Sequence, residues 1–486
     1  MIKERRRSFT FNLVMLIMMN VPWACTATAV DTQVVVETQK PKWTISKHLV
    51  GLHMVYSFAP DKAYEDGRFA EWVGESGVNT ARFPGGSVVK YWDWKKPTGV
   101  LNGDSWTPRW DNSQNRSAEE WMSLDEYLDF VKKTGITPLL GVNAISGKLY
   151  GREKESIQRA ADMVTHVKER GHGGAFWYIG NEDCHWYGGV AEYAKEFMVH
   201  ALAMKKVDPK IKIFWNYNNP SEKVISTFLK HDGGTSDGLE THGKWPYGGD
   251  PKGYDPGTYH EWLTEVPLRD RKNRNRKWRY AAATYREIAA KHGRKDYLIA
   301  NNEYGIGKGK NIEGFNRYGF GLLMTDLLQE HFLGNWDMTC FWDTIRGDEN
   351  GLMSPSNSYR LNPFHLGMDL LADAQGGQLF DVRTDNKLVY GFASSEAGRT
   401  LLYLINKTDK LQKLSISFTD TPSFDNVSGR VMQDTKDHWG EIVDIPVQGK
   451  GPFKAMIPPL SFCQIVLKHL AQQAPAGDSP EAAPEE

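Results

Sequence analysis

Two glutamates in this sequence each follow a short apolar run, and as a pair they could perform acid–base and nucleophilic chemistry. Glu182 comes after the run Phe176–Ile179, and Glu303 comes after the run Tyr297–Ala300. A protonated carboxyl can donate to a leaving oxygen while an ionised one attacks the carbon. Cleavage of a glycosidic bond needs such a pair, about 5–5.5 Å apart for retention and about 6.5–9.5 Å for inversion. Either glutamate alone would be read as a salt-bridge partner.

Polar residues after other apolar runs are candidate partners of these two carboxylates. Arg82 is always charged and its planar guanidinium forks onto a carboxylate, so we expect it to donate to Glu303. Asn181 is placed to hydrogen-bond a sugar hydroxyl, and Asn143 is a further candidate for substrate binding. Three histidines are either substrate contacts at the rim or structural residues, and His242 is the one we assign to substrate: they are His53, His185 and His242.

Aromatic residues are plentiful, with 17 Trp, 20 Tyr and 21 Phe. They either build a large core or line a cleft in which the C–H faces of sugars stack on rings. Trp342 follows an apolar run and is predicted to stack under the reacting sugar, the alternative being a plug of the interior. Four more tryptophans are either walls of sugar subsites or core residues: Trp92, Trp94, Trp186 and Trp245.

Eight apolar runs alternate with helical patterns between about residues 48 and 345. Such alternation predicts parallel strands with helices outside, and eight units favour a (β/α)8 TIM barrel over a doubly wound sheet. Because catalytic groups of these barrels lie at the C-terminal ends of strands, the fourth and seventh strands would bring Glu182 and Glu303 face to face. The predicted strands are Leu49–Val55, Val78–Phe83, Thr137–Val142, Ala175–Ile179, Ile211–Trp215, Gly238–Thr241, Tyr297–Asn301 and Met338–Trp342.

The pattern changes to a period of two after about residue 376, which predicts an antiparallel β-sandwich over residues 376–470. Residues 30–47 contain another strand, which we expect to join this sandwich. The barrel then occupies residues 48–375. The predicted fold class is therefore α/β, a TIM barrel with a C-terminal antiparallel β-sandwich.

Both ends of the chain are predicted to lie outside these domains. Residues 1–29 have a basic start, an apolar run too short to span a bilayer and an Ala-x-Ala pattern, which indicates an export signal. We therefore expect a secreted or periplasmic protein, with an N-terminal membrane anchor or a lipid anchor at Cys25 as alternatives. The Pro-, Ala- and Glu-rich tail 471–486 is expected to be disordered.

Charge and cysteine content narrow the class of function. A formal net charge of −1 gives no indication of a nucleic acid or a membrane as partner. Cys184, Cys340 and Cys463 contain no CxxC pair, so we predict no structural zinc, no disulfide framework and no cofactor. The basic segment 269–279 is either a solvated helix start or a rim patch that meets an anionic polysaccharide. The sequence gives no indication of the oligomeric state.

Four motifs together resemble the clan A glycoside hydrolases, nearest to the family 51 α-L-arabinofuranosidases and their relatives in families 39, 44 and 79. The motifs are Arg82–Gly86 followed by Trp92 and Trp94, then Leu139–Asn143, Tyr178–Glu182 and the glutamate of the seventh strand. The resemblance spans about residues 45–470. It implies double displacement with retention, with Glu182 as acid/base, Glu303 as nucleophile and Asn181 on the sugar 2-hydroxyl.

The sequence departs from family 51 at positions that are expected to contact the sugar. Gly-Lys-Trp follows His242 in place of a His-x-Tyr pattern, and Asn302 and Tyr304 flank Glu303 in place of Asp and Trp. We expect an arabinofuranosidase-like hydrolase of a plant or algal polysaccharide or its oligosaccharides. The alternative within the clan is an endo-acting glycanase of the agarase, xylanase or glucanase type.

Two other classes of protein remain open. A metal-dependent sugar isomerase barrel could use Glu182, His185, His242 and Glu303 as ligands. A carbohydrate-binding protein could retain the barrel without its catalysis. The presence of both glutamates favours the hydrolase over either.

Overall fold

The computed structural model describes most of the two predicted domains. The described residues are 29–56, 60–95, 122–245, 262–263, 278–306, 316–346, 350–396, 398–420 and 423–469. The predicted export signal up to residue 28, Cys25, residues 269–277 of the basic segment and the predicted tail 471–486 lie outside them.

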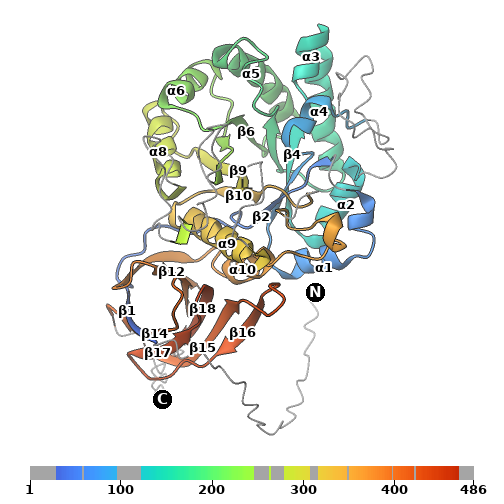
Figure 1. Cartoon of the computed structure of the whole chain (residues 1–486). Coiled ribbons are helices and arrows are strands. Elements are labelled where there is room, and N and C mark those ends of the chain that lie inside the picture. The colour runs from blue at the N-terminus through green and yellow to red at the C-terminus, as the bar shows by residue number, and fades with distance from the viewer. Residues whose placement is uncertain are drawn as a thin grey trace, which may run out of the picture.

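Eight parallel strands close into a barrel, with helices around it (Figure 1). The strands follow one another in chain order, and β10 pairs with both β9 and β2 to close the ring. They are β2 (Gly51–His53), β3 (Thr80–Phe83), β4 (Thr137–Val142), β5 (Phe176–Ile179), β6 (Lys212–Tyr217), β7 (Gly238–Thr241), β9 (Leu298–Ile306) and β10 (Met338–Phe341). Each overlaps one predicted strand, so the predicted TIM barrel is confirmed. A short strand, β8 (Lys244–Trp245), pairs with the end of β9.

Helices cover the barrel on its outside, and α2 shows how the sequence specifies them. The Ser123 hydroxyl accepts from the Glu126 amide at 3.3 Å, and the Glu126 carboxylate accepts from the Ser123 amide at 2.6 Å. This is a capping box, in which a Ser-x-x-Glu pattern satisfies two free amides at the start of the helix. The helices are α1 (Arg68–Glu75), α2 (Leu124–Thr134), α3 (Ile145–Tyr150), α4 (Glu153–Glu169), α5 (Val190–Val207), α6 (Glu222–His231), α8 (Trp278–Lys291), α9 (Arg317–Leu333) and α10 (Phe364–Ala372), with 3-10 turns at Asp61–Ala63, Gly86–Tyr91 and Pro355–Asn357.

The C-terminal strands build the predicted sandwich, and the strand from the beginning of the chain lies within it. Their order is β16-β15-β18-β13-β12-β11-β1-β14-β17. β1 departs from the predicted antiparallel arrangement, because it runs parallel to β14 while it is antiparallel to β11. The strands are β1 (Val30–Val36), β11 (Gln378–Thr384), β12 (Val389–Glu396), β13 (Arg399–Asn406), β14 (Gln412–Phe418), β15 (Phe424–Gln433), β16 (Glu441–Ile445), β17 (Phe453–Ile457) and β18 (Ser461–His469).

α9 lies between the barrel and the sandwich (Figure 1). Every residue of it from Tyr318 to Phe332 is buried, as expected for a helix covered on all sides. Its Asp326 accepts from the hydroxyl of Tyr390 in β12 at 2.8 Å and lies 3.8 Å from the buried Lys407. The two domains therefore share one interior.

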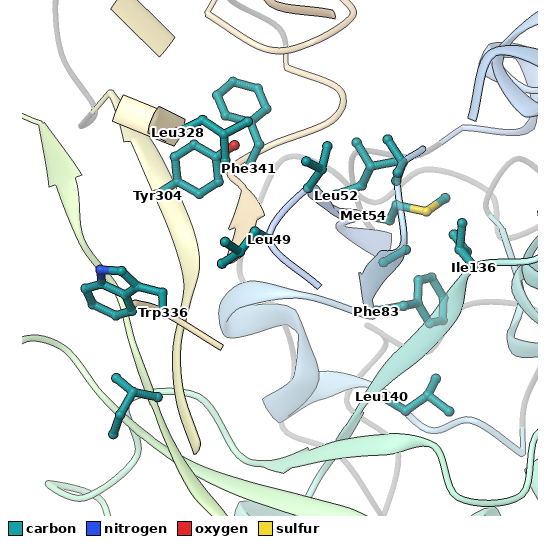
Figure 2. Packing of buried hydrophobic residues seen from close by; sticks show 14 of the residues in the cluster. Leu49, Leu52, Met54, Phe83, Ile136, Leu140, Tyr304, Leu328, Trp336 and Phe341 are labelled. Atoms are coloured by element: carbon teal, nitrogen blue, oxygen red, sulfur yellow. The ribbon is translucent and has the colours of Figure 1, made fainter. Parts of the chain in front are cut away.

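Alternate residues of the barrel strands belong to two different hydrophobic clusters. Leu140 and Phe83 pack outward under the helices, in the large cluster that Figure 2 shows from close by. Leu139 and Tyr178 belong to a small cluster inside the barrel. This period of two decides which polar side chains reach the barrel interior.

Within the described residues, no helix is both long and apolar enough to cross a bilayer. Cys184, Cys340 and Cys463 form no disulfide.

Candidate active site

Strand alternation aims three charged side chains into the barrel. In β3, Ala81 and Phe83 pack outward, so Arg82 between them points inward and is fully buried. In β7, Leu239 packs outward, so Glu240 points inward, and His242 follows two residues later on the same side. Glu240 is fully buried and His242 is 2% exposed.

A bulge in β9 brings Glu303 to the same place. Asn301 pairs with Thr339 of β10 and Tyr304 pairs with Phe341, so β9 holds one more residue than its partner between these pairs. The extra residue lets Asn302 and Glu303 both reach the polar interior while Tyr304 packs outward in the large cluster. Bulges commonly re-aim side chains next to active sites.

The turn after β5 presents Asn181 and Glu182. Gly180 has φ 69° and Glu182 has φ 55°, both in the left-handed region. The buried Asn216 of β6 holds this turn: its amide donates to the carbonyl of Gly180 at 2.7 Å and its Oδ1 accepts from the backbone N–H of Glu182. The Glu182 side chain emerges 38% exposed. The backbone of the turn, held by Asn216, therefore sets the direction in which the Glu182 side chain leaves the chain.

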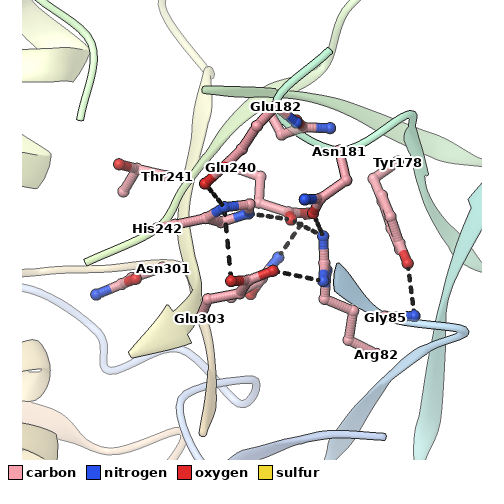
Figure 3. A network of polar contacts seen from close by, with 12 residues as sticks. Arg82, Gly85, Tyr178, Asn181, Glu182, Glu240, Thr241, His242, Asn301 and Glu303 are labelled. Atoms are coloured by element: carbon pink, nitrogen blue, oxygen red, sulfur yellow. Dashed lines mark hydrogen bonds and ion pairs between the residues drawn. The ribbon is translucent and has the colours of Figure 1, made fainter. Parts of the chain in front are cut away.

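Arg82 lies at the centre of the polar network formed by Arg82, Asn181, Glu182, Glu240, His242 and Glu303 (Figure 3). Its Nη1 donates to Oε1 of Glu303 at 3.2 Å, and its Nη2 donates to Oδ1 of Asn181 at 2.9 Å and lies 2.5 Å from Oε1 of Glu240. The guanidinium stacks at 4.0 Å on the ring of Tyr178. The predicted contact between Arg82 and Glu303 is therefore present.

His242 lies among three carboxylates. Its Nδ1 is 2.7 Å from Oε1 of Glu182 and 3.8 Å from Oε2 of Glu303, and its Nε2 is 3.0 Å from Oε1 of Glu240. Burial lowers the pKa of His242, but the charge of Glu303 and the hydrogen bonds with Glu182 and Glu240 outweigh it and raise the pKa to about 9. The imidazole is therefore a cation near neutral pH.

The contacts of His242 limit the separation of the two predicted catalytic carboxylates. Because Glu182 Oε1 and Glu303 Oε2 lie 2.7 and 3.8 Å from the same nitrogen, these oxygens are at most 6.5 Å apart, the sum of the two distances. The Glu303 side chain is only 6% exposed. One carboxylate is thus open to solvent and the other lies deeper, close enough to act on one bond.

Two predicted substrate contacts lie outside this network and bind other parts of the chain. Asn143 donates to the carbonyl of Trp92 at 3.2 Å and accepts from the amide of Ser146 at the start of α3 at 3.2 Å. Trp94 donates its indole N–H to the carbonyl of Arg159 in α4 at 3.2 Å. Both residues hold the loop after β3 against the barrel.

The remaining predicted residues lie around the site in different settings. His53 in β2 contacts Arg82 at 2.9 Å and is fully buried. Trp342, after β10, is 7% exposed and has the guanidinium of Arg346 4.7 Å from its ring. Trp186 follows Glu182 and is 43% exposed, with the exposed His185 beside it at 5.5 Å. Trp245 lies in β8, and its side chain is outside the described part of the structure.

Sequence reasoning missed Glu240, Tyr178 and Asn302, which complete the network from below. Glu240 had a usable signal, because it stands two residues before His242 in an apolar strand and so shares its face. Tyr178 and Asn302 gave no such signal, since each depends on a contact between strands: with Arg82 for the first and with Glu240, at 3.2 Å, for the second.

Among the residues that the structure describes, no three His, Cys, Asp or Glu side chains are grouped so that they could hold a metal ion.

Part of the chain matches the model of a known enzyme domain, and the fold matches solved structures. Residues 75–242 match the model of the alpha-L-arabinofuranosidase 1 domain, a segment that contains Arg82, Glu182 and Glu240. A family 51 arabinofuranosidase from Xanthomonas axonopodis pv. citri superposes with a TM-score of 0.63 at 15% identity, over 90% of this chain and 100% of that one. The predicted resemblance to clan A glycoside hydrolases near family 51 is confirmed.

Other clan A glycoside hydrolases share the architecture. A family 51 alpha-L-arabinofuranosidase from Bifidobacterium longum has a TM-score of 0.66 at 14% identity, and a family 44 endoglucanase from Clostridium thermocellum has 0.61 at 14%. Each match covers 90% of this chain and 100% of the other. At these identities the similarity establishes the fold. No curated protein matched the sequence.

Proposed function

We propose that this chain is a retaining glycoside hydrolase that acts on a plant or algal polysaccharide or its oligosaccharides by double displacement. The observation that carries the proposal is that Glu182 and Glu303 both lie close to Nδ1 of His242, at 2.7 and 3.8 Å. One oxygen of Glu182 and one of Glu303 are therefore within 6.5 Å of each other. That limit does not exceed the smallest carboxyl separation of inverting enzymes, about 6.5 Å, and so favours direct attack by one carboxylate.

Glu303 is the proposed nucleophile. It lies deep in the barrel, and the guanidinium of Arg82, 3.2 Å from its Oε1, holds its carboxylate in place. An ionised carboxylate attacks the anomeric carbon, the carbon–oxygen bond to the leaving group breaks, and a glycosyl-enzyme forms on Glu303. Water then attacks the same carbon and releases the sugar with its configuration retained.

Glu182 is the proposed acid/base. Its partly exposed side chain and the adjacent His242 Nδ1 at 2.7 Å allow one proton to be held between them. In the first step Glu182 gives a proton to the departing glycosidic oxygen, and in the second it takes one from the attacking water. Asn181, oriented by Arg82 at 2.9 Å, is proposed to bind a sugar hydroxyl, and the exposed Trp186 is proposed to form a subsite wall.

The family of the matched domain guides the choice of substrate. An arabinofuranosidase-type exo activity agrees with the match over residues 75–242. An endo activity on longer chains is the alternative, because an endoglucanase has the same architecture. We also propose that residues 1–29 direct export, which would bring the enzyme to extracellular or periplasmic glycans.

Two substitutions test the mechanism once a screen of aryl glycosides and polysaccharides has supplied a substrate. Glu303→Ala should lower kcat at least about 10⁴-fold with every leaving group, because no covalent intermediate can form. Glu182→Ala should lose activity on poor leaving groups but keep more of it on activated aryl glycosides, and azide should restore turnover as a glycosyl azide of retained configuration.

Glu330→Gln is the matched control. Glu330, near the end of α9, is also a fully buried glutamate, and it pairs with Arg279 of α8. This variant should keep wild-type kcat. Full activity of Glu303→Ala, or a glycosyl azide of inverted configuration, would contradict the assignments.

A further inference from the structure

Glu240 is a fully buried carboxylate beneath the proposed catalytic pair. Its Oε1 lies 2.5 Å from Nη2 of Arg82 and 3.0 Å from Nε2 of His242, and its Oε2 accepts from the side-chain amide of Asn302 at 3.2 Å. Its side chain is 0% exposed. Both oxygens are thus bound within the protein, so Glu240 acts through its neighbours.

The two cations that bind Glu240 also contact the proposed catalytic carboxylates, and His242 lies near both of them (Figure 3). Arg82 uses Nη2 for Glu240 and Nη1 for Glu303. His242 uses Nε2 for Glu240 and Nδ1 for Glu182. A carboxylate that fixes one nitrogen of an imidazole or guanidinium also sets the direction of the other nitrogen. Glu240 therefore connects the proposed nucleophile and the proposed acid/base through Arg82 and His242.

We propose that Glu240 is the positioning residue of this site: it orients Arg82 toward the nucleophile Glu303 and keeps His242 protonated and directed at the acid/base Glu182. The part of the inference that concerns catalysis rests on the proposed function, which assigns Glu303 as nucleophile and Glu182 as acid/base. Its structural part, the control of the His242 charge, can be tested without any substrate.

The charges around His242 explain why Glu240 matters for proton transfer. His242 faces Glu182 after β5, Glu240 in its own strand and Glu303 in β9, while Arg82 in β3 lies beyond Glu240. Because Glu182 and His242 are 2.7 Å apart, their protons leave in steps that belong to the pair, and the last step is the loss of the proton between them. The negative charge of Glu240, 3.0 Å from Nε2 of His242, raises the proton affinity of the Glu182–His242 pair. The proton that Glu182 donates is therefore retained to a higher pH.

The first test is the pH profile of kcat/KM for Glu240→Gln, which keeps the shape and removes the charge. Because the shared proton is then held less tightly, we expect the alkaline limb to move down by at least about one pH unit. We also expect a fall in kcat of at least about 10-fold with a smaller change in KM. The control Glu330→Gln should leave the alkaline limb in place. A Glu240→Gln profile that is lowered at every pH but not displaced would overturn the proposal.

The second test measures thermal unfolding against pH and needs no turnover. The pKa of His242 is raised to about 9 in the folded chain, against about 6.5 when unfolded. The stabilisation is therefore complete below about pH 6.5 and is lost as the pH rises to about 9. In Glu240→Gln this loss of Tm should be smaller and should end at lower pH, and in His242→Gln it should be absent.

The two measurements separate the inference from the proposed function. If no glycan is hydrolysed but the Tm curve of Glu240→Gln changes as stated, the proposed function fails and the control of His242 by Glu240 stands. If Tm falls by the same amount at every pH from 6 to 10, Glu240 supports the fold alone and the inference is wrong.

Discussion

At the scale of single residues, the site depends on side chains that satisfy several partners at once. Arg82 contacts His53, Asn181, Glu240 and Glu303 through only two of its nitrogens. A planar guanidinium can do this because its N–H groups point in fixed directions. The ammonium group of a lysine carries the same charge on one atom and cannot reach all four of these partners.

Arg82→Lys should therefore be far from a conservative change. We expect kcat/KM to fall about 100-fold or more and the free energy of unfolding to fall by about 2 kcal/mol, since buried charged groups lose hydrogen bonds. Steady-state kinetics and denaturant unfolding would measure both. Arg430→Lys, which changes a half-exposed arginine paired with Asp373, is the control and should leave kcat/KM unchanged. Wild-type kinetics in Arg82→Lys would rule out a role for the fork geometry.

At the scale of elements, the ends and irregularities of strands place the site. The turn after β5 needs Gly180, because a Cβ there would lie 2.2 Å from Oδ2 of Asp183. Asp183 is itself buried and pairs with Lys90 at 3.1 Å, and burial raises its pKa to about 6. A displaced turn would move Asn181 and Glu182 together.

Gly180→Ala should thus lower kcat by about 100-fold or more, since small misplacements of catalytic groups are costly. The matched control is Gly188→Ala: Gly188 also has a positive φ, of 83°, but has open space where the Cβ would be. It should lose only about 1 kcal/mol of stability and keep its kcat. Equal kinetic effects in the two variants would show that backbone strain, and not the contact with Asp183, is responsible.

The sequence predicts elements better than it predicts contacts between them. The eight strands, the capping box at Ser123 and the Arg82–Glu303 contact follow from local patterns and from the geometry of a barrel. The bulge in β9 does not, because it exists only relative to β10. The residue type of Trp94 allows either a subsite wall or a core position, and its hydrogen bond to a carbonyl of α4 is indicated by no local pattern.

At the scale of the whole molecule, the barrel and the sandwich stabilise each other through α9. The helix is buried from Tyr318 to Phe332, and the hydroxyl of Tyr318 donates to the carbonyls of Met432 and Leu460 at 3.0 and 2.7 Å. Removal of the sandwich would expose one side of an apolar helix. The barrel is therefore not an independent unit.

A chain that ends at residue 375 should accumulate as insoluble protein, or should lose its cooperative thermal transition if it is soluble. Large exposed apolar surfaces drive aggregation. The control is a chain that ends at residue 469, which keeps β18 and should retain the wild-type Tm. Calorimetry and size-exclusion chromatography would measure the outcome. A soluble truncated barrel with a sharp transition would contradict the shared interior.

The position of β1 has a consequence for the order of events on the ribosome. Val30 pairs with Gln412 and Val36 with Phe418, so the first strand to be made waits for a partner that is synthesised some 380 residues later. At about 5–20 residues per second this delay is about 20–80 s. Its antiparallel partner β11 is made some 350 residues after it, and until then the nascent chain carries β1 without a partner strand, which chaperones or export factors can bind. The native sheet is completed only after translation has almost ended.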